Sequence, residues 1–454
     1  MRSISFFLLI AVFLSLNSNR LNAQSNMLSE YIQMGISNNL QLQKNKLSLK
    51  KQSFKIAEAK SNRLPVVTFE PNYLLAGGGR RLFFPVGDLF NPAYQTLNDL
   101  TQTNSFPTDL ENVDEQLTPN NFHDTRIYAT YPLFNPAIYY NVKAQEQLIS
   151  VEQAKINAFK YELTQNIKTA YFNYLKTFEV LKVLATSENL LQEVYKFNQK
   201  LVKYDKATPD ILSGVRLELE KIKSERASIV QQQQMAKAYF NALLNRDFDA
   251  AIEQTAYINI AGVSQDLVSL RREAINNRPE LDQLSGAIKA TQLATQIEEK
   301  NLLPTVAIQG TAGFQGDGYT FASDQALATL AIGAQWTIFD GKKRKHKIEQ
   351  SKIEALELQR EYELVQQQVE LQVINAFYAL ESAKQRMVAE QETVNNAQEQ
   401  FSLVKKRYEN EKAILIEFLD AQTKLMNAKV GLAIARFDIL IQEAMLERAI
   451  AFKN

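Results

Sequence analysis

Cysteine is absent from all 454 residues of the chain, and histidine occurs only at His123 and His346. Without a thiol the protein can hold no disulfide, no thiolate metal site, no cysteine nucleophile and no lipid-modified N-terminal cysteine. The two histidines are far apart in the sequence, so a histidine-based metal site or catalytic group is not expected. No nucleophile, base and acid occur together at a readable spacing, and we predict neither an enzyme nor a bound cofactor or metal.

An excess of charge of one sign is also lacking. The 51 Lys and Arg residues balance 50 Asp and Glu residues, and the net charge is +1 at pH 7. This balance indicates neither a nucleic-acid partner nor a disordered chain. The densest basic run, residues 342–347, contains no Tyr, Phe or Trp. We therefore interpret it as the solvated start of a helix and not as a nucleic-acid surface.

Long hydrophobic runs are missing beyond the N-terminus. Arg2 precedes the apolar run 4–16, and the small residue Ala23 follows it. This arrangement predicts a secretory signal peptide over residues 1–23. No later stretch reaches the 18 or so apolar residues of a spanning helix. We expect an exported chain that can enter a membrane only as strands.

Proline and glycine are unevenly distributed. None of the eleven prolines lies beyond Pro304, and residues 137–208 and 342–430 contain neither proline nor glycine. Such a composition permits very long helices. A helix over residues 141–204 would be roughly 95 Å long at about 1.5 Å per residue, which exceeds the needs of an ordinary globular domain.

Four stretches alternate apolar with small or polar residues, as half-exposed strands do. We predict strands over residues 66–75, 126–134, 305–314 and 328–339, close to the length of about 9–11 residues that a tilted strand needs to cross a bilayer. We interpret Trp336 and Tyr131 as membrane-boundary aromatic residues. A half-buried strand of a soluble sandwich remains the alternative. The predicted outward residues are Val67, Phe69, Tyr73, Leu75, Ile127, Ala129, Tyr131, Leu133, Val306, Ile308, Ala312, Phe314, Ala328, Leu330, Ile332, Ala334, Trp336 and Ile338.

The chain contains an internal duplication with a domain-scale period of roughly 200 residues. Its paired segments are Leu64-Pro65-Val66-Val67 with Leu303-Pro304-Thr305-Val306, Tyr171-Phe172 with Phe377-Tyr378, and Lys203-Tyr204 with Arg407-Tyr408. Each half supplies two strands and then a long helix. Because a membrane barrel needs eight or more strands, several copies must contribute to one barrel. Two copies would give a filled barrel, whereas three would give twelve strands and a lumen, which the small and polar inward residues favour.

Residues 407–422, Arg-Tyr-Glu-Asn-Glu-Lys-Ala-Ile-Leu-Ile-Glu-Phe-Leu-Asp-Ala-Gln, resemble the helix-reversal segment of the TolC-like outer-membrane efflux proteins. In that family an Arg/Lys-aromatic pair leads to Asp-Val-Leu-Asp-Ala. Residues 339–344 are similar to its strand-to-helix turn, and the resemblance covers nearly the whole mature chain. It implies a mainly α-helical homotrimer with a membrane β part, in which four strands per chain form a twelve-stranded β-barrel on a coiled-coil α-helical barrel.

The resemblance also implies a location and a function. The protein would be a channel in the cell outer membrane, in contact with its lipid and extended into the periplasm. It would be the exit duct of a tripartite efflux system for small molecules or ions, docked to a periplasmic membrane-fusion adaptor and an inner-membrane transporter of RND or ABC type. The alternatives are the exit duct of a type I protein secretion system and a periplasmic coiled-coil scaffold. The sequence does not specify the cargo, the pump or the closed-state gate bonds.

Site residues follow from the same resemblance. Glu417 and Asp420 match positions that form acidic rings at the periplasmic constriction of the family, and their spacing of three puts them on one helix face. Tyr408 and Tyr204 match gate-region aromatic residues. The chain departs from the family pattern at four positions, so the gate bonds of the family are not transferred. Ser213 stands where the family often has Asp, and Ala413 where it can have a basic gate residue. Glu411 and Ala207 stand in place of the usual glycines of the two turns.

The duplication gives the predicted order of segments. They are the signal peptide (1–23), a first helix (24–64), barrel strands 1 and 2 with a long outer loop (65–135, the loop being 76–125), the long helical hairpin of repeat 1 (136–245), a connecting segment (246–265), the helix of repeat 2 (266–303), barrel strands 3 and 4 with a short outer loop (304–340), and the long helical hairpin of repeat 2 (341–454).

Overall fold

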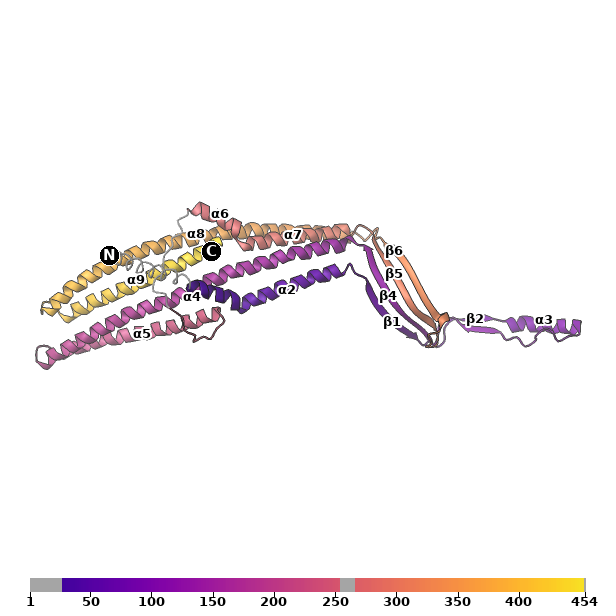
Figure 1. Ribbon diagram of the computed structural model, residues 1–454, viewed down its shortest axis with the longest axis horizontal. Coiled ribbons are helices and arrows are strands. Elements are labelled where there is room, and N and C mark those ends of the chain that lie inside the picture. The colour runs from indigo at the N-terminus through magenta and orange to yellow at the C-terminus, as the bar shows by residue number, and fades with distance from the viewer. Residues whose placement is uncertain (1–26, 254–265, 453–454) are drawn as a thin grey trace, which may run out of the picture. The chain divides into compact units, whose positions relative to one another are not determined.

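The computed structural model describes residues 27–253 and 266–452 (Figure 1). The predicted signal peptide and part of the predicted connecting segment therefore lie outside the described residues. The chain divides into two compact units. We call Met1–Phe54, Glu146–Thr291 and Ile353–Asn454 the helical unit, and Lys55–Gln145 with Gln292–Lys352 the strand unit.

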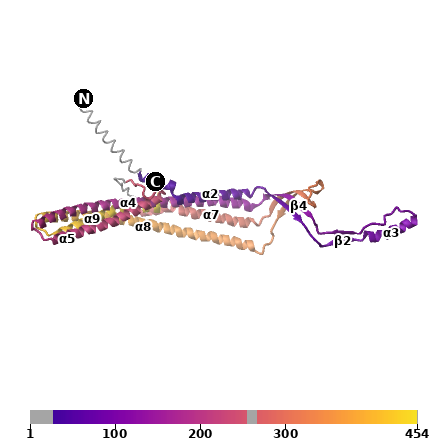
Figure 2. The ribbon, with the colours of Figure 1, turned by 90° about the horizontal axis from the view of Figure 1, so that it is seen from below.

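Long helices dominate the chain (Figures 1 and 2). After a first helix over 27–38 come α2 (Leu40–Ser61), α4 (Pro136–Lys203), α5 (Asp210–Leu243), α6 (Leu267–Asn277), α7 (Pro279–Lys300), α8 (Lys343–Glu409) and α9 (Leu415–Ile450). Helices α4 and α8 contain 68 and 67 residues, so each is about 100 Å long. The predicted long helical hairpins are confirmed. Among the described residues, no helix combines the length and the apolar character needed to cross a membrane.

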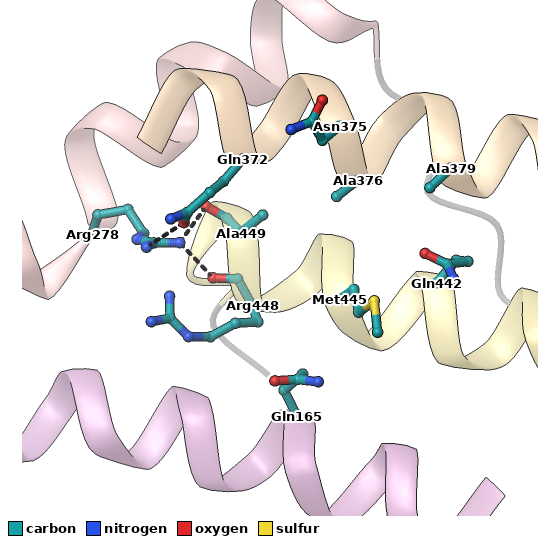
Figure 3. A pocket seen from close by; sticks show the side chains of 10 residues that line it. All are labelled: Gln165, Arg278, Gln372, Asn375, Ala376, Ala379, Gln442, Met445, Arg448 and Ala449. Atoms are coloured by element: carbon teal, nitrogen blue, oxygen red, sulfur yellow. Dashed lines mark hydrogen bonds between the residues drawn. The ribbon is translucent and has the colours of Figure 1, made fainter. Parts of the chain in front are cut away.

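Two of the predicted helices are interrupted. The helix predicted over 24–64 breaks at Asn39, whose Oδ1 accepts the N–H groups of Gln41 and Leu42 and so caps α2. The helix predicted over 266–303 breaks at Arg278, because the following residue begins α7 as a proline without an N–H group. Figure 3 shows the Arg278 side chain reaching the end of α9.

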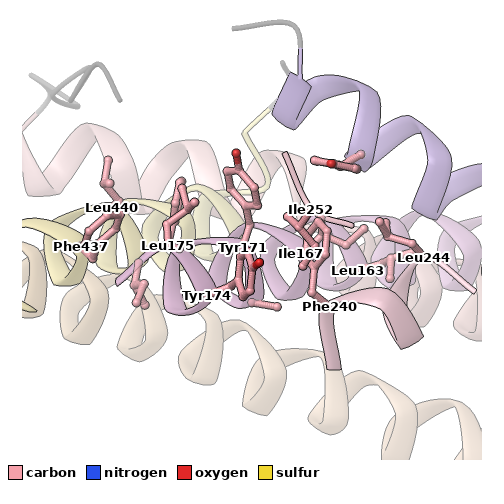
Figure 4. Packing of buried hydrophobic residues seen from close by; sticks show 14 of the residues in the cluster. Leu163, Ile167, Tyr171, Tyr174, Leu175, Phe240, Leu244, Ile252, Phe437 and Leu440 are labelled. Carbon is pink, nitrogen blue, oxygen red and sulfur yellow. The ribbon is translucent and has the colours of Figure 1, made fainter. Parts of the chain in front are cut away.

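The helical unit has three apolar clusters. The first is centred on α4 and α5, where Tyr171 and Phe240 are almost fully buried with ring centroids 5.6 Å apart (Figure 4). The second joins α4, α5, α8 and α9 close to the ends of their hairpins. The third packs α6 against α8 and α9 through residues such as Leu270, Val373 and Ile439. Burial of each large apolar side chain contributes about 1.5–3 kcal/mol, so packing holds these helices together.

The strand unit contains one antiparallel sheet of four strands in the order β1-β4-β5-β6. These are β1 (Val66–Leu74), β4 (Phe122–Phe134), β5 (Thr305–Asp317) and β6 (Ala326–Gln335). The four predicted strands are confirmed, but the predicted end of the fourth is wrong. Strand β6 ends before Trp336, so Trp336 and Ile338 are not strand residues. The indole Nε1 of Trp336 donates instead to the carbonyl oxygen of Leu302 at 2.9 Å.

The register places the predicted apolar residues on one face of this sheet. One row crosses all four strands as Phe69, Ile127, Ala312 and Ala328. A second row crosses three strands as Tyr131, Ile308 and Ile332. The opposite face is polar and includes the pair Glu70 and Arg126 and the bonded hydroxyls of Thr311 and Thr329. Phe69 is 65% exposed and Ile332 71%, so no part of the chain that the structure describes covers the apolar face.

The predicted outer loop over 76–125 is largely ordered into elements. It contains β2 (Arg81–Phe84), α3 (Val86–Thr101) and β3 (Val113–Gln116), and β2 and β3 pair as a separate two-stranded sheet. Strand β4 also begins within the predicted loop. The described residues thus hold two short strands in addition to the four of the predicted sheet. We call residues 75–121 the outer arm.

Candidate functional site

The chain reverses direction between α8 and α9, over residues 410–414. Backbone hydrogen bonds at the C-terminal end of α8 stabilise this reversal. Glu411 has the left-handed φ of 58°. Its N–H donates to the carbonyl oxygen of Tyr408 at 3.0 Å, and the N–H of Lys412 donates to that of Arg407 at 2.7 Å. These two bonds form a Schellman motif, which usually has glycine at the left-handed position. Glu411 thus occupies a glycine-like position, as the sequence comparison suggested.

The reversal from α4 to α5 repeats this geometry. Its left-handed residue is Asp205, with a φ of 59°, and not Ala207 as the sequence suggested. The N–H groups of Asp205 and Lys206 donate to the carbonyl oxygens of Val202 and Leu201. Alignment of the two reversals on their left-handed residues makes Val202, and not Tyr204, the counterpart of Tyr408. Tyr204 lies at the helix end and is 69% exposed.

Tyr408 joins the two hairpins. Its hydroxyl donates to Oδ1 of Asn198 in α4 at 2.8 Å, and its ring lies 5.0 Å from the Phe418 ring of α9. Asn198 is fully buried, and its Nδ2 donates to the carbonyl oxygen of Val194. Burial raises the pKa of Tyr408, so its hydroxyl stays protonated at neutral pH. Asn198 was not predicted from the sequence. The available signal was a polar residue four positions after Val194, on the apolar face of a helix.

The predicted constriction carboxylates lie on the exposed face of α9. Glu417 in the first turn pairs with Arg407 at 3.3 Å, and Asp420 pairs with Lys424 at 2.7 Å. The side chains of Glu417 and Asp420 are 42% and 58% exposed, and exposed pairs of this kind contribute only about 0–1 kcal/mol. The structure therefore brings the two carboxylates to one accessible surface, where each has a cation from its own chain.

A buried carboxyl group lies farther along α9. Glu443 is 9% exposed, and its Oε1 has no hydrogen-bond partner within the described residues. Burial, and then the charge of Glu447, raise the pKa of Glu443 to about 7, although Lys384 and Lys168 act in the opposite direction. Lys168 pairs with Glu447. No sequence pattern marks this group, because its burial depends on packing between helices that are distant along the chain.

A groove of about 440 Å³ lies in the helical unit between α4, α8 and α9 (Figure 3). Arg278 is 3% exposed there and pairs with Glu280. It also donates to Oε1 of Gln372 and to the carbonyl oxygens of Arg448 and Ala449. All five N–H groups of this guanidinium are thus used within the chain. The arrangement closes the C-terminal end of α9, and we interpret it as a structural joint.

The two predicted membrane-boundary residues belong to the strand unit. Tyr131 lies on the apolar face of β4 and is 43% exposed, and Trp336 follows β6 with 61% exposure. Within the described ranges, no group of three His, Cys, Asp or Glu side chains could hold a metal ion. The residues that remain as a candidate site are those of the two reversals and the Asn198–Tyr408 bond beside them.

Comparisons with known proteins agree on a family and a fold. The model of the family described as Outer membrane efflux protein matches residues 270–451. The toluene efflux pump outer membrane protein TtgC of Pseudomonas putida is 21% identical over 313 residues, which are 68% of this chain and 64% of that relative. The Campylobacter jejuni CmeC outer membrane channel has a TM-score of 0.75 at 12% identity, with 93% of this chain and 85% of that chain covered. For CusC the TM-score is 0.76 at 15% identity, with 94% and 92% covered. Residues 270–451 are therefore similar to the outer membrane efflux protein family, and the chain has the fold of these outer-membrane channels.

Proposed function

We propose that three copies of this chain form a channel in the outer membrane, which serves as the exit duct of an efflux system. The observation that carries the proposal is the four-stranded sheet, which has one exposed apolar face and one polar face within each chain. An apolar face of this kind suits lipid, and the polar face suits a water-filled lumen. A periplasmic scaffold would have no use for such a sheet.

The sheet edges require several copies, and the polar inner face favours three over two. Strands β1 and β6 are the two ends of the sheet order, and an unpaired strand edge is not tolerated in lipid. Pairing of β1 in one copy with β6 in the next removes both edges. Three copies give twelve strands, enough to enclose a lumen, and their helices would extend the duct into the periplasm.

The proposal includes export and partners. An N-terminal signal peptide over 1–23 would deliver the chain to the periplasm. The name of TtgC describes the outer membrane protein of an efflux pump, which supports an inner-membrane transporter of RND or ABC type and a periplasmic adaptor as partners of this chain. The hairpin ends would be the part that they contact. The duct itself would do no chemistry.

The constriction would lie at the reversal from α8 to α9. Three copies bring six carboxylates there through Glu417 and Asp420, and such rings attract cations. Arg407 and Lys424 pair with these carboxylates and would offset part of that charge. We therefore expect a modest cation selectivity, which should increase when Arg407 is replaced by Ala.

Single-channel conductance in a planar bilayer tests the proposal. The purified protein should show a small, cation-selective conductance, and Glu417→Ala/Asp420→Ala should increase the conductance or remove the selectivity. The matched control is Glu354→Ala/Glu357→Ala, an exposed pair with the same spacing on α8, which should leave both unchanged.

The outcomes separate the duct from its constriction. A stable conductance that the reversal variants do not change would retain the duct and reject Glu417 and Asp420 as its constriction. No conductance from protein that is folded and inserted would mean either a fully shut gate or a role other than a channel. Recovery of the protein in a salt-washed soluble fraction would instead support the scaffold alternative.

A further inference from the structure

Within the outer arm, one face of α3 packs against the segment that follows the helix, residues 106–112. Asn91 of α3 exchanges two side-chain hydrogen bonds with the backbone of Leu110, at 2.8 and 2.9 Å. Asn98 does the same with the backbone of Phe106, at 2.7 and 3.0 Å. A Cβ atom on Gly87 would lie 2.1 Å from the carbonyl oxygen of Leu110. This face of α3 is therefore fixed closely against residues 106–112.

A second face of α3 is apolar, and none of the helices and strands that the structure describes covers it. It consists of Val86, Phe90, Ala93, Leu97 and Leu100. Phe90 is 45% exposed, Leu97 39% and Leu100 76%. The steps along this face are four, three, four and three residues, which is the a/d spacing of a coiled-coil seam.

The charges of α3 lie away from this seam. The helix contains no Lys or Arg, and its acidic residues Asp88 and Asp99 lie on a third face together with Gln95. The positions of α3 that flank the seam are uncharged, so the helix itself brings no like charges together along the seam. The outer arm as a whole has two basic and six acidic residues.

The charge pattern favours another copy of α3, and not a membrane surface, as the partner of this seam. Helices that lie on membrane surfaces are rich in Lys and Arg on their polar face, whereas α3 has none and its arm is acidic. A helix of 16 residues beside a two-stranded hairpin of four-residue strands is also marginally stable alone. A self-complementary seam with uncharged flanks fits other copies of the same helix.

We propose that α3 packs along this seam against α3 of two other copies, as a short parallel three-helix coiled coil. The number of copies rests on the proposed trimeric function. The outer arms are inserted between β1 and β4, so each chain of a barrel would contribute one. The coiled coil would join the three chains outside the barrel.

The absence of cysteine allows a direct test in the full chain. Ala93→Cys places a thiol at a d position of the seam, and Gln95→Cys places one on the polar face as the matched control. Because a disulfide requires Cα atoms about 4.4–6.8 Å apart, mild oxidation of outer-membrane vesicles should link chains through Cys at 93 at least tenfold more than through Cys at 95. The product should be a dimer on a non-reducing gel. Leu97→Asp, added to Ala93→Cys, should remove the link.

Each other outcome has a defined meaning. Intact trimers on an unheated gel with no link at position 93 would overturn the coiled coil and leave the proposed function. Equal linking at positions 93 and 95 would overturn the seam. The thiol at position 93 can also be labelled with a maleimide. If the label reacts in detergent but not in lipid vesicles, the membrane covers the seam and the inference is overturned. If the unsubstituted protein shows no trimer on an unheated gel, both proposals are overturned.

Discussion

The Asn198–Tyr408 bond allows a quantitative prediction about the hairpin ends. Tyr408→Phe removes the hydroxyl that donates to Asn198 Oδ1 at 2.8 Å and leaves a fully buried oxygen without that donor. Such a loss costs about 1–3 kcal/mol. The local opening equilibrium of residues 404–418 should therefore increase by roughly 5- to 150-fold. Hydrogen exchange of the backbone amides in this segment measures that change directly.

Two matched variants make the reasoning refutable. Tyr204→Phe removes a hydroxyl from a tyrosine that is 69% exposed and should leave the exchange rates of the reversal unchanged. Asn198→Leu combined with Tyr408→Phe replaces both polar partners by apolar groups, and this should recover much of the lost protection. If Tyr408→Phe exchanges no faster than the unsubstituted protein, the bond does not hold the hairpins together and the assignment fails.

Three further predictions concern stability. Glu443 is neutral in the folded protein up to its pKa of about 7. The free energy of unfolding should therefore fall as pH rises from about 4.5 to 7, by roughly 3 kcal/mol in total. Glu443→Gln should flatten this pH dependence in thermal melts, and an unchanged pH dependence would contradict the prediction. Gly313→Ala places a Cβ atom 2.2 Å from the carbonyl oxygen of Thr125 in the neighbouring strand. It should lower stability by about 1–3 kcal/mol, which would be seen as less trimer on an unheated gel. The control is Gly333→Ala, whose Cβ atom would have no described atom within 4 Å. Glu411→Gly should stabilise the protein by about 1 kcal/mol because the φ of 58° suits glycine, and a lower melting temperature would refute this.

Much of the fold could be predicted because its signals are local. The alternation of residues 328–334 and the absence of proline and glycine from 342–430 are properties of single segments. The first segment lies within β6, and the second covers all of α8 and the beginning of α9. The end of β6 could not be predicted from alternation. Trp336 continues the apolar pattern, but its indole bond to Leu302 depends on a segment 34 residues away.

The candidate site was only partly accessible to sequence reasoning for the same reason. Glu417 and Asp420 carry a motif, whereas Asn198 becomes important only through its contact with a residue 210 positions later in the chain. The ordered outer arm was missed because its helix is held by side-chain amides of Asn91 and Asn98. In a sequence those residues indicate a loop, since they form turns more often than helix contacts.

The sheet register also constrains how one copy can meet the next. The apolar residues of β1 have odd numbers, such as Phe69, and those of β6 have even numbers, such as Leu330. A continuous lipid-facing surface therefore requires odd residues of β1 to lie opposite even residues of β6, which excludes half of all conceivable pairings between copies. Within a chain, β4 already fixes the parity of β1. A one-residue insertion in β1 would thus force either the fold of the chain or its assembly with neighbours to fail.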